Sequence, residues 1–168
     1  MRPRALAFLL AAALGRAAEP PAILFDCRAD VAALEQRLRA GGGDPAKVRR
    51  PKTAADLHAL VSGKRYKFVV TREGELVVAP VPAPATNDLY AHAILAGGAP
   101  VRTAGGIRIE RTGERVTRIA IDRDSMSYCP TEASLEAAVT ALAGLGVARD
   151  LVVIDDRPPD CLPPRPAR

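Results

Sequence analysis

The 168-residue sequence predicts a small α+β fold, an antiparallel or mixed sheet built from two hairpins with two to three helices packed on one side. Two pairs of segments with β-type alternation flank short turns that contain glycine, which is typical of hairpins. Other segments place apolar residues three and four positions apart, as amphipathic helices do. Aromatic residues are scarce, so we expect a core of Ala, Val, Leu and Ile.

The first half carries clear signals for helix ends. Asp30 is a favourable N-cap, and Thr53 with Asp56 three positions later resembles a capping box. Glycines at 41 and 63 are expected to end these helices. The expected order is a strand over 22–25, a helix between Asp30 and Gly41, a shorter helix between Thr53 and Gly63, and a hairpin of 66–71 with 75–79.

The second half is expected to start with an apolar segment over 89–95 that places His92 at a strand start. Charged Arg108 and Glu110 alternate with isoleucines, which indicates a sheet with one solvated face. The further expected elements are a hairpin of 107–111 with 116–121, a helix from about 132 to 145, and a buried strand over 151–154.

Residues 1–17 are predicted to be a signal peptide. Arg2 and Arg4 give a positive start, and residues 5–14 are apolar but too few to span a bilayer. Ala17 lies among small residues of the kind that a signal peptidase reads. Cleavage there removes three arginines and no acid, so the formal net charge falls from +5 to +2.

The mature chain is expected to be one α+β domain over residues 18–157, followed by a Pro-rich tail over 158–168. No later segment is long and apolar enough to predict stable membrane insertion after cleavage. We therefore expect a secreted or periplasmic bacterial protein.

The basic residues do not predict nucleic-acid binding. No aromatic residue interleaves the first of two short basic groups, and the chain contains no Trp, so a solvated loop is the favoured interpretation. The expected partner is instead another protein or a small ligand. The two groups are Lys47, Arg49, Arg50 and Lys52, and then Lys64, Arg65 and Lys67.

Three cysteines in an exported chain predict one disulfide and one remaining thiol. We favour Cys27 with Cys161, because each lies close to a predicted strand near one end of the mature chain. A bridge from Cys129 is the alternative that the sequence leaves open.

Residues 90–131 carry the highest density of regularly placed polar residues and glycines in the chain. They contain His92, an apolar pair, two glycines, Val101, Ala104-Gly105, a hairpin, and then an elbow, residues 125–131, with the sequence SMSYCPT. This series resembles a module of uncharacterised bacterial proteins, toxin-type C-terminal regions and plant IQ-motif calmodulin-binding proteins.

The resemblance implies an α+β module with a defined elbow, and it implies no particular reaction. The usual elbow reads Ser-Gly-His-Tyr, whereas this chain has Met126 and Ser127 at the second and third of those positions. Gly106 stands where the pattern usually has an acid. A catalytic role for the elbow His would therefore be lost here.

Ligand binding near His92, Arg102 and Tyr128 is the predicted function, in a non-enzymatic binding or interaction domain. The alternative is an enzyme or toxin-like effector with a groove around His92 and Tyr128, for which His92, Ser125 and Tyr128 are the catalytic candidates. The enzyme alternative has two versions. One pairs Cys129 with His92 as nucleophile and base; the other uses His92 and Tyr128 to hold nicotinamide, with an acid from Glu132 or Glu136.

No cofactor and no metal site are expected. Two histidines without Cys/His spacing do not predict a zinc site. Four aspartates, at positions 122, 124, 155 and 156, follow predicted strands, but their spacing matches no calcium loop, and surface solvation is the favoured explanation.

Overall fold

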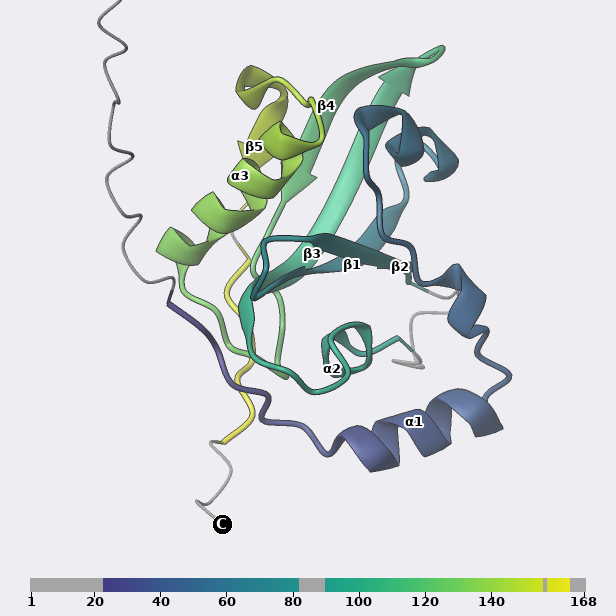
Figure 1. Ribbon diagram of the computed structural model, residues 1–168, viewed down its shortest axis with the longest axis vertical. Helices are drawn as coiled ribbons and strands as arrows, with labels where there is room; N and C mark the ends of the chain where they lie inside the picture. The colour runs from purple at the N-terminus through teal and green to yellow at the C-terminus, as the bar shows by residue number, and fades with distance from the viewer. Residues whose placement is uncertain (1–22, 82–89, 156, 164–168) are drawn as a thin grey trace, which may run out of the picture.

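The computed structural model describes residues 23–81, 90–155 and 157–163. Its centre is one five-stranded mixed sheet with the strand order β2-β1-β3-β4-β5, which confirms the predicted α+β class (Figure 1). The strands are β1 (Arg65–Thr71), β2 (Leu76–Pro80), β3 (Val101–Thr112), β4 (Arg115–Ile121) and β5 (Val152–Ile154).

Both predicted hairpins form. β1 pairs with β2 and β3 with β4, in each case antiparallel, and the two hairpins join through an antiparallel β1–β3 ladder. Gly74 and Gly113 adopt φ angles of 88° and 61° in the two turns, a conformation that a side chain disfavours. β5 then pairs in parallel with β4 after a crossover through a helix.

Three α-helices and four short 3₁₀ segments occur among the described residues. Asp30 caps the first α-helix by accepting a hydrogen bond from the Ala33 amide, and Thr53 with Asp56 forms the predicted capping box. The α-helices are α1 (Val31–Ala40), α2 (His92–Leu95) and α3 (Leu135–Gly144); the 3₁₀ segments are η1 (Pro45–Lys47), η2 (Ala54–Ala59), η3 (Glu132–Ser134) and η4 (Arg149–Leu151).

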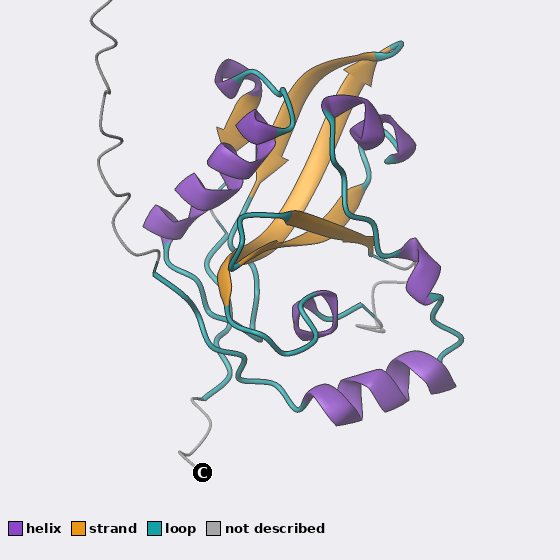
Figure 2. Ribbon diagram, viewed as in Figure 1, coloured by secondary structure: helices purple, strands orange, loops and turns teal. Residues whose placement is uncertain are grey.

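Helices cover both faces of the sheet, so the prediction that they lie on one side is wrong (Figure 2). Alternation along β1 explains the two cores, because Phe68 and Val70 point to one face and Val69 to the other. The first face packs against α3, including Leu135 and Leu142. The second face packs against α1 and α2.

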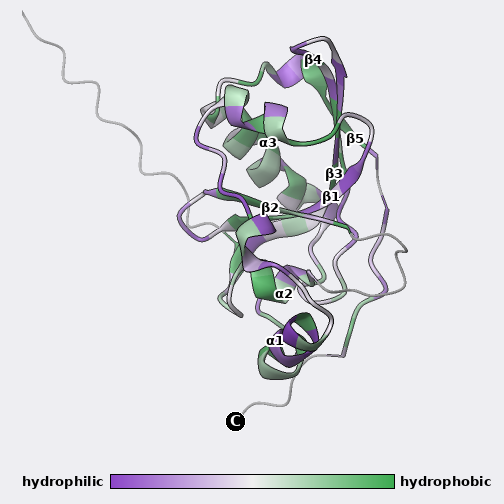
Figure 3. Cartoon of the chain, turned by 90° about the vertical axis from the view of Figure 1, so that its right-hand side faces the viewer, coloured by the Kyte–Doolittle hydropathy of each residue, from purple (hydrophilic) through white to green (hydrophobic). Residues whose placement is uncertain are grey.

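The second face is only partly covered. Cross-strand pairing places Arg65, Lys67, Arg108, Glu110 and Arg118 on this face, beyond the region that α1 and α2 cover. Figure 3 shows the contrast in hydropathy, with α3 mostly hydrophobic and hydrophilic residues along the strands. The solvated sheet face that the alternation predicts is therefore present, next to the smaller core.

Three local predictions are wrong. Phe25 makes only an isolated bridge with Val101, so no strand forms there. The segment with His92 forms the short helix α2, because Gly97 and Gly98, with φ angles of 59° and 78°, turn the chain directly after it. β5 is an edge strand with exposed Val153 and Ile154, not a buried strand.

The predicted signal peptide, residues 1–17, lies outside the described residues. No helix among the described residues has the length and apolar character needed to cross a membrane. Part of the Pro-rich tail is described, and it lies against the elbow, where the Leu162 amide donates to the Met126 carbonyl over 3.3 Å. Arg28 also donates to the Leu162 carbonyl over 2.8 Å.

The disulfide joins Cys129 to Cys161, with 5.3 Å between the Cα atoms, so the predicted pair of Cys27 with Cys161 is wrong. The prediction assumed that the segment before Cys27 forms a strand near β5. That segment instead meets β3, while the tail returns from β5 to the elbow. Cys27 is a half-buried free thiol, and Arg28 next to it donates from its backbone amide to the Ser127 carbonyl.

Cys161→Ser is expected to lower the free energy of unfolding by about 3–4 kcal/mol, because the bridge closes a loop with a sequence separation of 32. Cys27→Ser is the matched control and should retain the bridge. Urea unfolding measures the stability, and peptide mapping without reduction identifies the bridge. A peptide that links Cys27 to Cys161 would contradict this pairing.

Candidate functional site

A cavity of about 340 Å³ lies between the uncovered part of the sheet and the elbow. Val81 and Met126 contribute apolar surface to its wall. Its polar wall comes from β1, α2, β3 and the segment after β4, through Arg65, Lys67, His92, Gly106, Asp124 and Ser127.

Two glycines of β3, Gly105 and Gly106, allow the segment after β4 to pass close to the sheet here. A Cβ at Gly105 would collide with the backbone carbonyl of Asp122, and a Cβ at Gly106 would meet the side chains of Arg65 and Asp122. Neither glycine has a positive φ, so the requirement is for space and not for an unusual backbone conformation.

β4 ends just before Asp122, whose side chain takes over the role of a backbone hydrogen-bond acceptor. The Asp122 amide still donates to the Gly106 carbonyl over 2.9 Å, but the Gly106 amide donates to the carboxylate Oδ1 of Asp122, over 2.7 Å. The side chain thus replaces the backbone carbonyl in the ladder, and the chain leaves the sheet. The Asp122 carboxylate lies directly above Gly106, in the space that a Cβ would occupy.

The Asp122 side chain is 8% exposed, and hydrogen bonds compensate for its burial. It accepts hydrogen bonds from the amides of Gly106 and Asp124 and from Nη2 of Arg65, the last over 2.8 Å to Oδ2. These donors satisfy the buried carboxylate, and the carboxylate in turn fixes the guanidinium that balances its charge.

Arg65 is held along one edge of its guanidinium. Its Nη2 also donates to Asp124 over 3.0 Å, whereas its Nε and Nη1 make no hydrogen bond with any residue in the described part of the chain. Burial opposes the charge on Arg65, but the carboxylates of Asp122 and Asp124 outweigh this effect and raise its pKa. Arg65 therefore stays charged and has donors left for a ligand at the cavity wall.

Lys67 is half-buried beside Arg65 on the same face of β1. Burial, followed by the positive charge of Arg65, lowers the pKa of Lys67 to about 8, although the carboxylate of Asp124 opposes the shift. At neutral pH most Lys67 side chains are still charged, in a place where that charge is poorly solvated.

His92 is the first residue of α2 and is buried. Its Nε2 lies 2.9 Å from the Gly105 carbonyl, which only accepts, so Nε2 carries the proton and Nδ1 does not. Burial and the nearby charge of Lys67 lower the pKa of His92 to about 4. The imidazole is therefore neutral at neutral pH, and it connects α2 to β3.

The other predicted site residues lie elsewhere. Tyr128 is 1% exposed, donates to the Ala99 carbonyl over 2.9 Å and does not line the cavity; burial, followed by Cys27, raises its pKa. Ser125 is also buried, and its Oγ has no hydrogen-bond partner in the described part of the chain. Arg102 donates to the Arg72 carbonyl at a separate hollow beside α3.

Of the predicted ligand-binding set His92, Arg102 and Tyr128, only His92 therefore lines the cavity. From the sequence, Arg65 and Lys67 are expected only as members of a basic group, and Asp122 and Asp124 only at the surface. One signal that points to the correct place is the glycine pair inside a strand pattern, which is typical of a close approach by other groups.

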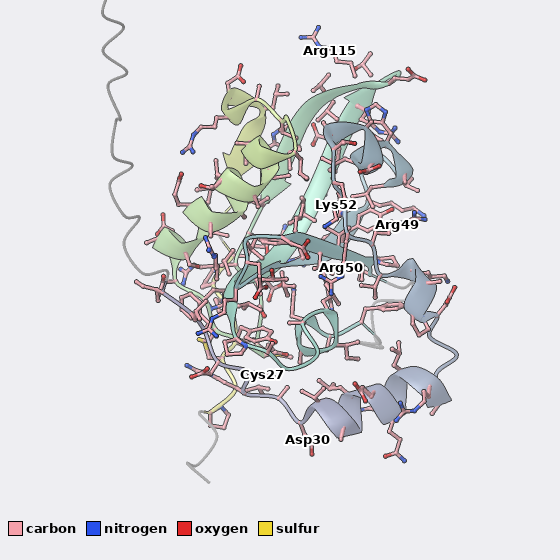
Figure 4. The ribbon with its side chains drawn as sticks, viewed as in Figure 1. Cys27, Asp30, Arg49, Arg50, Lys52 and Arg115 are labelled. Atoms are coloured by element: carbon pink, nitrogen blue, oxygen red, sulfur yellow. A yellow bond between two sulfur atoms is a disulfide. The ribbon has the colours of Figure 1, made fainter. Side chains whose placement is uncertain are left out.

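The basic loop before β1 lines a separate, more open hollow of about 480 Å³, in which Arg49 and Arg50 are both exposed. Arg50 and Lys52 both pair with Glu75, and all three side chains are exposed. Figure 4 labels Arg49, Arg50 and Lys52 in this loop. Within residues 23–81, 90–155 and 157–163, no group of three or more His, Cys, Asp or Glu side chains is placed to hold a metal ion.

The fold and the cavity together define a small α+β protein with cationic side chains at a ligand-sized cavity. The chain matches no protein-family model, no curated protein and no solved structure. The resemblance of residues 90–131 to the elbow-containing module therefore stays a prediction.

His92→Gln is expected to reduce the sensitivity of the protein to acid. The pKa of His92 is about 4 in the folded protein, whereas the ordinary pKa of a histidine, as in the unfolded chain, is 6.5. On acidification the unfolded chain therefore takes up the proton first. Wild-type stability should therefore fall between pH 6.5 and 4, by up to about 2 kcal/mol from pH 7 to pH 5 through this group.

Urea unfolding at pH 7 and pH 5 measures the effect, and His58→Gln, at an exposed histidine, is the matched control. If wild type and His92→Gln lose equal stability between these pH values, His92 is not held neutral by burial.

Proposed function

We propose that this protein is an exported, non-enzymatic binding domain that holds a small carboxylate-bearing ligand in the cavity beside β1 and β3. The observation that carries the proposal is the pair of cations at the cavity wall, Arg65 with a fixed guanidinium and unused donors, and the half-buried Lys67. A carboxylate placed between them would receive charge-assisted hydrogen bonds from both.

Charge balance favours an anion over a cation. The aspartates at 122 and 124 already receive hydrogen bonds from Arg65 and from backbone amides, so their charges are largely compensated. The negative charge of a bound anion would stabilise the ammonium form of Lys67 and raise its pKa, and this interaction would favour the complex.

The volume limits the ligand to a small molecule. About 340 Å³ is near the lower end of the range for small-molecule sites, which is about 300–1,000 Å³. Val81 and Met126 would contact the apolar part of the ligand, and Ser127 could contribute a hydroxyl. A metabolite of a few carbon atoms fits these limits.

Two features support export. The start of the chain has the pattern of a signal peptide, and the Cys129–Cys161 disulfide is typical of an oxidising compartment. We propose a secreted or periplasmic location on these grounds. The enzyme alternative, a groove around His92 and Tyr128, has less support, because both polar groups are bonded to backbone carbonyls.

L-Lactate is a suitable probe, and titration calorimetry measures its affinity. Lys67→Met is expected to weaken binding tenfold or more, which corresponds to about 1.4 kcal/mol or more. Because Lys67 loses its charge as pH rises through about 8, wild-type affinity should fall between pH 7 and pH 9.

Lys64→Met, at an exposed lysine near the start of β1, is the matched control and should bind as wild type does. Tyr128→Phe tests the alternative groove, since it removes a hydroxyl that does not line the cavity. If Tyr128→Phe abolishes binding while Lys67→Met does not, the ligand is not held in the proposed place.

A further inference from the structure

We propose that Lys67 is an amine nucleophile and that the ligand of the cavity is a 2-oxo carboxylic acid, which Lys67 captures as an imine. This inference rests on the proposed function, because it uses the same cavity and the same carboxylate contact. It adds a covalent step and names the chemical class of the ligand.

The choice of lysine at this position is the first argument. The chain has 20 arginines but only four lysines, so lysine is the unusual cation here. Three of the lysines, Lys47, Lys52 and Lys64, are exposed, and within the described ranges Lys67 alone lines the cavity with His92. An arginine would supply the same charge, but it cannot become a neutral nucleophile in a protein, whereas a lysine can.

The surroundings of Lys67 favour the reactive form. Burial and the charge of Arg65 lower its pKa to about 8, so roughly a tenth of the side chains are neutral at pH 7. A desolvated lysine next to another cation is a recurrent arrangement for Schiff-base formation. The neighbouring His92 is neutral at pH 7, so it adds no positive charge to those of Arg65 and Lys67.

Arg65 is placed to bind the carboxylate of the ligand. Its Nη2 is fixed by Asp122 and Asp124, and its Nε lies above Gly106, so the guanidinium is already oriented at the cavity wall. A carboxylate held by Nη1 would be kept close to Lys67, which neighbours Arg65 on the same face of β1. In a 2-oxo acid the carbonyl carbon is bonded directly to that carboxylate, so one residue can hold one group while the other reacts.

The chemical step balances without an oxidant or a reductant. The lone pair of neutral Nζ attacks the carbonyl carbon, and the C=O π electrons move to oxygen, which takes a proton to give a carbinolamine. The nitrogen then forms a double bond to carbon as the hydroxyl leaves, with a proton, as water. Overall, an ammonium and a ketone give a protonated imine and one water, with no net change in protons.

Reductive trapping tests the proposal. The full-length protein, secreted and with its disulfide intact, is incubated with pyruvate and cyanoborohydride, and the modified lysines are then found by peptide mass spectrometry. The expected result is a carboxyethyl group on Lys67 at least tenfold in excess over Lys47, Lys52 and Lys64. Lys67→Arg should abolish this signal, while Lys64→Arg should leave it unchanged.

Two further probes separate the parts of the inference. Acetone has the carbonyl without the carboxylate, so it should label Lys67 at least tenfold less than pyruvate. L-Lactate has the carboxylate without the carbonyl, so it should compete with pyruvate but form no adduct.

If lactate binds but pyruvate does not label Lys67 selectively, the imine is wrong and the proposed binding function stands. If lactate does not bind and labelling is uniform over the four lysines, both are wrong. Equal labelling of Lys67 by acetone and pyruvate would overturn the assignment of a 2-oxo acid.

Discussion

The exchange of acceptors at Asp122 is the interaction on which the rest of the site depends. Because the Asp122 carboxylate takes the place of its own carbonyl in the ladder with Gly106, β4 ends there and the chain leaves the sheet. The freed carbonyl lies against Gly105, where no side chain is present to block it. The same carboxylate binds Arg65, so one residue both ends the strand and orients a cation at the cavity.

The elbow follows from this exit of the chain. Cys129 adopts a φ of 53°, which is unusual for a residue with a side chain, and the disulfide to Cys161 holds it in place. Tyr128 fills the smaller core and bonds to the Ala99 carbonyl. The elbow is thus fixed from two sides, and Met126 and Ser127 form a wall of the cavity.

Local signals in the sequence predicted the hairpins, α1, α3 and the capping box, because each depends on residues close together in the chain. The cavity depends on contacts between distant residues. Arg65 and Asp122 are 57 positions apart, and no periodicity connects them. The predicted cysteine pairing was wrong for the same reason. The return of the tail to the elbow depends on where β5 lies in the sheet, which no local pattern shows.

For His92 the sequence indicates an unusual residue but not its role in the structure. The sequence marks it as one of only two histidines, next to apolar residues. Its role depends on Gly105, thirteen positions later, which brings a backbone carbonyl to Nε2. The sequence groups Tyr128 with His92 because both lie in residues 90–131, which carry the densest set of regularly placed polar residues. In the structure the elbow brings Ser127 to the cavity and buries the tyrosine.

The proposed function requires Lys67 and Arg65 to bind a carboxylate together in the cavity, and the most direct measurement is the pKa of Lys67 itself. Protein labelled with ¹³C in lysine gives four Cε signals, which single Lys→Arg variants assign, and these can be titrated with and without L-lactate. The account predicts a pKa of about 8 for Lys67 in the free protein and a higher value in the presence of lactate. A Lys67 that titrates with the three exposed lysines, and whose pKa does not change with lactate, would contradict it.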